Sequence, residues 1–170
     1  LAGERALTIM RVLAGVPSVA REAPDGALPQ ELGLTSAVSF AKGCYLGQEI
    51  MARIEARGAV KKGLARLRLE RAANPDDEGG AAALEGRELR LGGREIGRVG
   101  SVVALPDGAL AGLAVLRTGL PVDADLEVEG APGAYARVWP PSAAGGMPGR
   151  TDAAGAVGGV HGGTERDPDL

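Results

Sequence analysis

The sequence of 170 residues has very few aromatic side chains and almost no cysteine or histidine. One Trp, two Tyr and one Phe leave the hydrophobic core to be built from Leu, Val, Ile and Ala. The single Cys excludes a disulfide bond within the chain. One Cys and one His also exclude a zinc or iron–sulfur site held by this chain alone, because such sites take about four ligands.

Long apolar runs are lacking as well. None approaches the roughly 20 residues of a membrane-spanning helix, and no charged segment followed by an apolar one opens the chain as a signal peptide would. We therefore expect a cytoplasmic protein with no membrane partner. The chain begins at Leu1 rather than Met, and a helical pattern is already present there, which predicts the C-terminal part of a longer protein.

The net charge of −3 gives no overall attraction for nucleic acid. Residues 42–68, however, hold seven Lys and Arg residues against two Glu residues. Such a stretch is either a solvated face of mixed charge or a surface that attracts a polyanion or an RNA backbone. RNA binding by base stacking needs aromatic residues between the basic ones. These are lacking, so we expect no direct nucleic-acid partner.

Two helices are predicted in the first third of the chain. Apolar residues recur at helical spacing in residues 3–14, and Gly15 is a typical residue to follow a helix. A second helix is predicted over residues 47–56, with its end at Gly58. The expected apolar faces comprise Ala6, Leu7, Met10, Leu13 and Ala14 in the first helix, and Ile50, Met51 and Ile54 in the second.

The segment between these helices shows little periodicity. Proline and glycine interrupt residues 16–36, which predicts an extended connection. Residues 38–40 suit a short strand, and Gly43 suits a turn.

After Val60 the apolar period changes from helical to alternating. Five or six short strands, spaced by roughly 10 residues, predict a small antiparallel barrel. Gly97 and Gly100 are expected at bulges or close contacts, and Trp139 is expected to pack the last strand. The predicted strands cover residues 63–70, 88–91, 94–105, 109–116, 126–128 and 135–139.

The last part of the chain, residues 141–170, is rich in Gly, Ala and Pro. It has almost nothing to bury, so we expect it to be disordered. His161 lies there between glycines, and no second ligand stands near it to make a metal site.

One segment, residues 42–49 (KGCYLGQE), is dense in reactive residues and glycine. A lone cysteine such as Cys44 is often only a small buried hydrophobic residue. Against that, Lys42 precedes Cys44 and a predicted helix start follows it, and both favour the thiolate and a lowered pKa. Gly43 and Gly47 let the backbone approach a ligand closely, and Glu49 falls in the first helical turn, where a carboxylate is favoured. These residues leave a packed and a functional thiol equally open.

The same segment resembles the K-G-C-[FY]-x-G-Q-E motif of the YgfZ/GcvT-type folate-binding family, and specifically its YgfZ branch. Residues 6–17 (ALTIMRVLAGVP) resemble the family's helix, and residues 28–34 (LPQELGL) resemble a second family element. Residues 93–101 and 122–130 resemble parts of the family's C-terminal barrel. The resemblance covers residues 1 to about 140.

This resemblance implies an α+β fold. Residues 1–58 would be the C-terminal remnant of a ferredoxin-like folate-binding region, residues 59–140 a small β-barrel domain, and residues 141–170 lie outside it. Most of the folate region is missing, so we expect an incomplete pocket for the implied ligand, tetrahydrofolate. The resemblance implies a functional thiol at Cys44 and folate contacts from Lys42, Gly43, Tyr45, Gly47, Gln48, Glu49 and Arg53.

The implied function is that of an accessory protein for the assembly or repair of [4Fe–4S] enzymes, with an effect on tRNA modification. Its implied partners are folate and iron–sulfur client or assembly proteins. One Cys cannot hold such a cluster, so Cys44 would share ligation with a partner or a small thiol, or act in thiol exchange or persulfide transfer. Four basic residues would meet the glutamate tail of folate or the surface of a partner: Arg53, Arg57, Lys61 and Lys62.

Two alternatives stay open. The sister branch contains tetrahydrofolate-dependent aminomethyltransferases of the glycine-cleavage type, which carry an acid in R-x-E-A-G. This chain has Leu13 at that place, and leucine neither accepts a proton nor holds an amine. We therefore favour a maturation factor over a turnover enzyme. The third possibility is a truncated remnant with a folded barrel and no activity.

Overall fold

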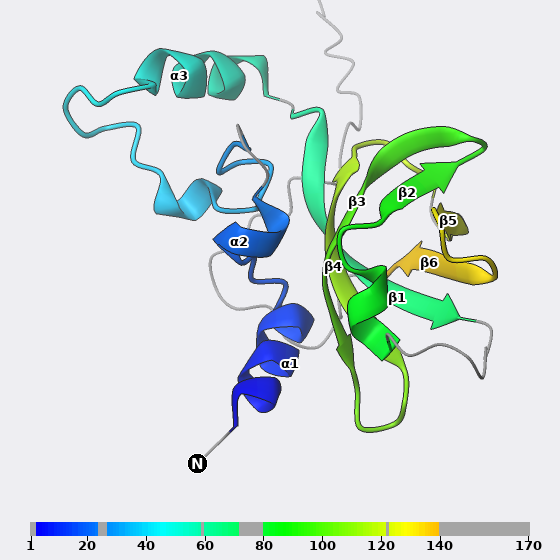
Figure 1. The fold of residues 1–170 in the computed structure, drawn as a ribbon. Helices are drawn as coiled ribbons and strands as arrows, with labels where there is room; N and C mark the ends of the chain where they lie inside the picture. The colour runs from blue at the N-terminus through cyan, green and yellow to red at the C-terminus, as the bar shows by residue number, and fades with distance from the viewer. Residues whose placement is uncertain (1–2, 24–26, 59, 72–79, 122, 140–170) are drawn as a thin grey trace, which may run out of the picture.

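The computed structural model describes residues 3–23, 27–58, 60–71, 80–121 and 123–139. The three α-helices come first along the chain, and the strands follow (Figure 1). The helical elements are α1 (Glu4–Ala14), α2 (Val19–Glu22), the 3-10 helix η1 (Thr35–Ala37), α3 (Gln48–Arg57) and a second 3-10 helix, η2 (Gly80–Leu84). The strands are β1 (Lys62–Arg71), β2 (Glu88–Leu91), β3 (Arg94–Ala104), β4 (Leu110–Arg117), β5 (Leu126–Val128) and β6 (Ala134–Val138).

The six strands close into an antiparallel barrel in the order β1-β4-β3-β2-β5-β6, with β6 pairing back onto β1. The alternating pattern explains this arrangement, since every second side chain of a strand points to the same face. In β1, Leu67 and Leu69 are buried, whereas Arg68 between them is exposed. The α+β class and the barrel predicted from the sequence are both confirmed.

The barrel interior is filled by aliphatic side chains. Leu67, Leu89 and Leu126 are fully buried in it, and small residues such as Ala114 and Ala136 complete the packing. None of the described side chains in this cluster is aromatic, which agrees with the low aromatic content of the sequence.

A second apolar cluster lies outside the barrel wall, beneath α1. Val12 of α1 is 1% exposed and packs with Val103, Ala111 and Leu113 of β3 and β4. Trp139 packs against this cluster, and its backbone N–H donates to the Arg66 carbonyl at 2.7 Å. Trp139, the residue directly after β6, therefore packs on the outside of the barrel wall.

Three glycines behave as the sequence predicts. Gly15 ends α1 in the left-handed conformation at φ 67°, which non-glycine residues rarely adopt. A Cβ at Gly97 would lie 2.3 Å from the Val115 carbonyl oxygen, and a Cβ at Gly100 would lie 2.6 Å from a Glu22 carboxylate oxygen. Neither contact is possible for a larger residue, so both positions are close approaches.

Some predictions need correction. Residues 16–36 are not simply extended, because α2 and most of η1 form within them. Residues 38–40 form no strand, since they pair with no other strand among the described residues. The described residues before β1 contain helices and turns without a sheet, so the ferredoxin-like part of the prediction is not confirmed.

The apolar face predicted for the first helix is also not the face that packs on the barrel. Leu7 and Met10 of that face are 59% and 65% exposed. In α3, Met51 is buried and Ile54 half-buried, but Ile50 is exposed.

Within the described residues, every helix is too short or too polar to cross a bilayer. The predicted disordered tail and His161 lie outside the described residues.

Candidate functional site

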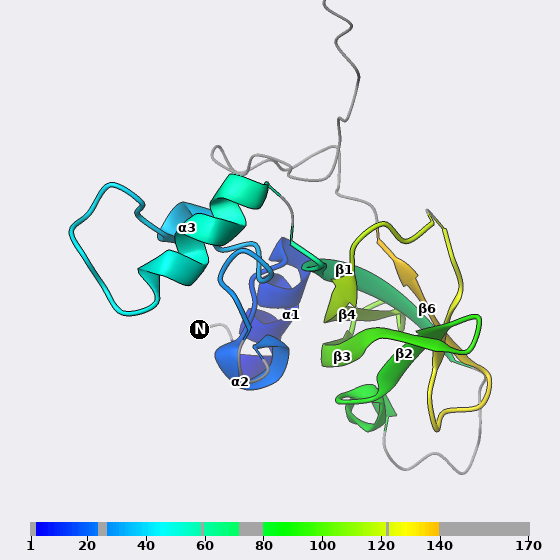
Figure 2. The same ribbon diagram turned by 90° about the horizontal axis from the view of Figure 1, so that it is seen from above.

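The KGCYLGQE segment lies away from the barrel. It leads from η1 into α3, and α3 stands apart from the barrel in both views (Figures 1 and 2). The loop before η1 is joined to the barrel by a hydrogen bond of 2.7 Å, which the Leu64 N–H donates to the Glu31 carbonyl. The barrel therefore anchors the base of this unit, while the unit itself projects to one side.

Cys44 is exposed, which removes the interpretation of a small buried hydrophobic residue. Its sulfur lies 3.8 Å from Nε2 of Gln48, the first residue of α3. The Gln48 Oε1 atom accepts a hydrogen bond from the Tyr45 backbone N–H at 3.1 Å. Because a backbone N–H can only donate, it fixes the orientation of the amide and directs the amide NH₂ toward the sulfur. Gln48 thus presents a hydrogen-bond donor to the thiol.

A pocket of about 360 Å³ opens beside this thiol-bearing turn. Lys42, Tyr45 and Gly47 line one side, and the Lys42 ammonium lies 4.8 Å from the centre of the Tyr45 ring. This distance suits a cation–π contact. The remaining lining is mostly apolar and comes from the loop and from α3: Leu28, Pro29, Ala37, Val38, Ser39, Leu46, Ile50 and Met51.

Three other predicted site residues do not line the pocket. Gly43 and Glu49 are exposed and do not line the pocket, although Glu49 stands in the first turn of α3 as expected. Arg53 is exposed further along α3. The structure therefore groups Lys42, Tyr45 and Gly47 around the pocket and Cys44 with Gln48 beside it.

The basic residues of the stretch 42–68 are largely exposed to solvent. Arg53, Lys61 and Lys62 are exposed. Arg66 instead donates to the Leu13 carbonyl of α1 at 3.0 Å, so it fastens the helix to β1. At least one of the seven basic residues is therefore part of the internal packing rather than of a ligand surface.

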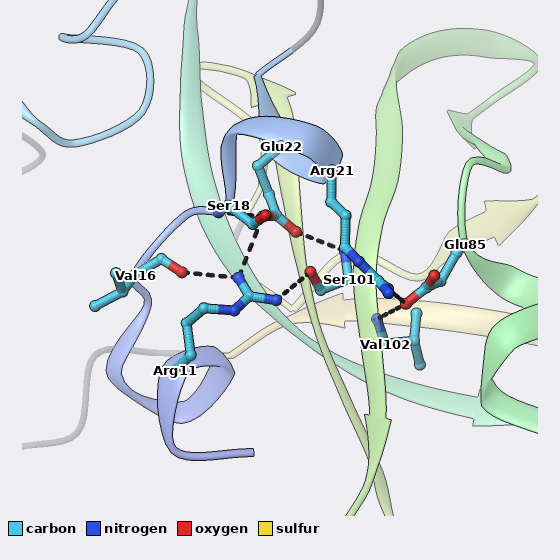
Figure 3. A network of polar contacts seen from close by, with 8 residues as sticks. All are labelled: Arg11, Val16, Ser18, Arg21, Glu22, Glu85, Ser101 and Val102. Atoms are coloured by element: carbon cyan, nitrogen blue, oxygen red, sulfur yellow. Dashed lines mark hydrogen bonds and ion pairs between the residues drawn. The ribbon is translucent and has the colours of Figure 1, made fainter. Parts of the chain in front are cut away.

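A buried polar network joins the helices to the barrel (Figure 3). The Glu22 side chain of α2 is fully buried and accepts hydrogen bonds from the backbone N–H groups of Ser18 and Ser101, both at 2.6 Å. Arg11 of α1 pairs with the same carboxylate at 3.3 Å and donates to the Ser101 hydroxyl at 2.5 Å. Every group that faces Glu22 in this network is a donor, which suits a carboxylate.

The network continues along β3. Arg21 pairs with Glu85, and the same Glu85 oxygen accepts the Val102 N–H at 3.0 Å. Both acidic residues thus bind backbone N–H groups of β3 from outside the barrel wall. Together these contacts fix α1 and α2 against the barrel.

No pattern in the sequence predicts this network. Arg11 and Ser101 are 90 residues apart, and Glu22 and Ser101 are 79 apart, so no local pattern links them. The available signals were the position of Glu22 four residues after Ser18 and the glycine beside Ser101. Neither signal points to a partner.

No model of a protein family matches the chain. The tRNA-modifying protein YgfZ of Edwardsiella ictaluri is 39% identical over 118 residues, which are 67% of this chain and 34% of the relative. The tRNA-modifying protein YgfZ of Serratia proteamaculans is 37% identical over 119 residues, with 68% and 34% covered. The human mitochondrial iron–sulfur cluster assembly factor IBA57 is 49% identical over 57 residues, with 32% and 16% covered.

These relatives, together with the barrel and the KGCYLGQE turn, confirm the resemblance drawn from the sequence. The chain belongs to the YgfZ-type family. It spans about a third of the length of the YgfZ relatives that it matches.

Proposed function

We propose that this chain is part of a folate-binding accessory protein for the assembly or repair of [4Fe–4S] enzymes, with tRNA modification among the processes affected. The observation that carries the proposal is the exposed Cys44, which lies next to an amide donor and beside a pocket within the family's KGCYLGQE motif. Two relatives, a tRNA-modifying protein and an iron–sulfur cluster assembly factor, support the same function. The proposal places the protein in the cytoplasm.

The pocket lining suits one end of tetrahydrofolate better than the other. A volume of about 360 Å³ with apolar walls lies in the range of small-molecule sites. Tyr45 offers an aromatic face to the benzoyl ring, and Lys42 offers a positive charge to a glutamate carboxylate. Among the described residues, no Asp or Glu lines the pocket to accept hydrogen bonds from the pterin amines. We therefore assign the benzoyl-glutamate end to this pocket and the pterin to another part of the protein.

Cys44 is proposed to act as a thiolate toward an iron–sulfur client. The Gln48 amide NH₂ lies 3.8 Å from the sulfur and orients it. A [4Fe–4S] cluster takes about four thiolates, so the other ligands must come from the client, an assembly protein or a small thiol. Persulfide transfer is equally compatible with this geometry: the Cys44 sulfur would take the outer sulfur of a donor protein's persulfide, and the donor would leave as a thiol.

The proposal is tested in bacterial cells that lack their own YgfZ, by measuring a [4Fe–4S]-dependent tRNA-modifying enzyme. Because the chain spans a third of its relatives, it is introduced in place of the matched residues of the Edwardsiella protein. If the thiol is functional, Cys44→Ser should reduce the restored activity by a factor of at least about ten. A double variant, Cys44→Ser with Ser36→Cys, keeps one exposed thiol eight positions earlier in the chain and should not recover the activity. Full activity of Cys44→Ser would overturn the proposal.

The second candidate, an aminomethyltransferase, makes a different prediction. It requires release of the aminomethyl group from a lipoyl carrier protein to tetrahydrofolate. Leu13 argues against this activity. Leucine has no carboxylate, so this position cannot hold the amine. Turnover in a glycine-cleavage assay with the lipoyl carrier would reverse the preference.

A further inference from the structure

The end of the barrel where β1 begins carries exposed positive charge. Lys62 of β1 and Arg117 of β4 are direct partners in the strand register, so their exposed side chains lie beside each other on one face of the sheet. Lys61, which is also exposed, comes just before them. Among the described residues, no carboxylate pairs with any of these three side chains. We call Lys61, Lys62 and Arg117 the basic end of the barrel.

A second pair of facing cations on the barrel is neutralised by the chain itself. Arg68 of β1 lies opposite Arg137 of β6. Arg137 pairs with Asp125 at 2.5 Å and with Glu70 at 3.5 Å. Like charges that lie directly opposite each other destabilise a sheet. The basic end has no such carboxylates among the described residues, so an anion from outside them would offset the repulsion there.

Backbone hydrogen bonds hold the basic end in a fixed arrangement. The Thr118 N–H donates to the Lys61 carbonyl at 3.0 Å, and the Thr118 hydroxyl donates to the Val60 carbonyl at 3.2 Å. These bonds continue the pairing of β1 with β4 and keep Lys61 beside the facing pair. Cations clustered in this way attract an anion that carries several charges.

Helix α3 connects the basic end with the pocket beside Cys44. Ile50 and Met51, in the first half of α3, line the pocket. Arg53 is exposed and lies one turn after Ile50 on the same side of the helix. From Ile50 to the end of α3 is about 10 Å, at a rise of about 1.5 Å per residue. Exposed cations therefore follow one another from the pocket along α3 to the start of β1 (Figure 1).

We propose that Arg53 and the basic end bind the γ-linked glutamate tail of a folyl-polyglutamate. This inference rests on the proposed function, which assigns the benzoyl-glutamate end of folate to the pocket. Each further glutamate adds one carboxylate, so the tail is a chain of negative charges that begins at the pocket. A single glutamate is shorter than the stretch of α3 between the pocket and β1. The protein would therefore select polyglutamylated folates over the monoglutamate.

The test compares two ligands on the 170-residue chain: p-aminobenzoyl-glutamate with one glutamate, and the same compound with five γ-linked glutamates. Isothermal titration calorimetry at low salt measures both dissociation constants. The five-glutamate ligand should bind at least about tenfold more tightly, because several exposed ion pairs act together. Added salt should reduce this ratio, since it screens exposed charges.

Two double variants identify the residues responsible for the ratio. Lys62→Gln with Arg117→Gln should bring the ratio close to one. Arg68→Gln with Arg137→Gln removes the same charge from the other facing pair and should keep the ratio. A ratio that the first variant retains, or that both variants lose, would overturn the proposal.

A ratio close to one in the unaltered chain would also overturn it, and this is the result expected if carboxylates of residues 140–170 already occupied the basic end. If the one-glutamate ligand binds and the tail adds nothing, the pocket assignment stands and only the present inference fails. If neither ligand binds, the pocket assignment fails as well. Yeast transfer RNA that binds through Lys62 and Arg117, with no gain from the glutamate tail, would assign the basic end to an RNA backbone instead.

Discussion

Glu22 shows how one buried side chain sets the relation between the helices and the barrel. Its carboxylate receives two backbone N–H groups and the Arg11 guanidinium, and one of the two N–H groups belongs to Ser101 of β3. A buried charge is tolerated only when such partners replace the lost water. The residue therefore contributes to positioning as much as to stability.

Glu22→Gln should be strongly destabilising although the two side chains have almost the same shape. The glutamine NH₂ must point at one of the donors, which leaves two donors facing each other in a buried site. We expect a loss of about 2–3 kcal/mol in the free energy of unfolding, measured by urea denaturation. Glu127→Gln on the exposed face of β5 is the control and should change stability by less than about 0.5 kcal/mol. A neutral Glu22→Gln would show that the network does not hold the helices.

Gly100 is required because of Glu22. A Cβ there would meet the carboxylate oxygen at 2.6 Å and two carbons of the same side chain at 2.9 and 3.0 Å. Gly100→Ala should therefore displace Glu22 and cost about 1–3 kcal/mol, as overpacking does. Gly63→Ala in β1 is the matched control, since its new Cβ would meet only Thr118 Cγ2 at 3.9 Å. Thermal unfolding followed by circular dichroism measures both variants, and equal melting temperatures would contradict this account.

At the scale of elements, the barrel was predictable and the connections were not. The alternation of Leu67 and Leu69 with charged residues is a local property, so the sequence alone locates β1. The turn at Gly92 and Gly93 likewise predicts the β2–β3 hairpin. α2 escaped prediction because it is four residues long, and its Glu22 is held by β3, which is distant in the sequence.

The candidate site divides in the same way. The motif predicted a turn that leads into a helix, because its residues are neighbours in the sequence. The structure has Lys42, Cys44 and Tyr45 in that turn and Gln48 at the start of α3. The pocket wall from Leu28 and Pro29 was not predicted as part of it. That wall depends on how the loop folds back onto α3, and no short-range pattern encodes such a return.

Helix α1 gave the most instructive error, since its predicted core face is its exposed face. The two faces make opposite predictions for truncation. Val12→Ala should lower the free energy of unfolding by about 1–3 kcal/mol, because it opens space in a closed cluster. Leu7→Ala removes more carbon atoms but from water, and it should cost less than about 0.5 kcal/mol in the chain alone. Chemical denaturation measures the loss of stability in the two variants. A larger loss for Leu7→Ala than for Val12→Ala would mean that Leu7, and not Val12, faces the barrel.

On the scale of the whole molecule, the barrel and the thiol-bearing unit differ in how they are held. The strands of the barrel form a closed ring of hydrogen bonds around a filled interior, and buried polar contacts hold α1 and α2 against the outside of the barrel. α3 and the KGCYLGQE turn stand apart from it (Figure 2). Regions with few buried contacts open locally at low free energy, and ligand-binding segments are often drawn from them.

Hydrogen exchange should therefore show two levels of protection. Amides of β1, β3 and β4 should exchange only through global unfolding, whereas those of α3 should exchange at least about a hundredfold faster, because their opening leaves the barrel intact. Tetrahydrofolate, if its benzoyl-glutamate end occupies the pocket, should slow exchange in residues 42–51 and leave the barrel strands unchanged. Folic acid fragments that lack the benzoyl-glutamate end serve as the control and should have no effect. If α3 exchanged at the rate of the barrel strands, the thiol-bearing unit would be as firmly held as the barrel. Local opening of α3 would then have no part in ligand binding.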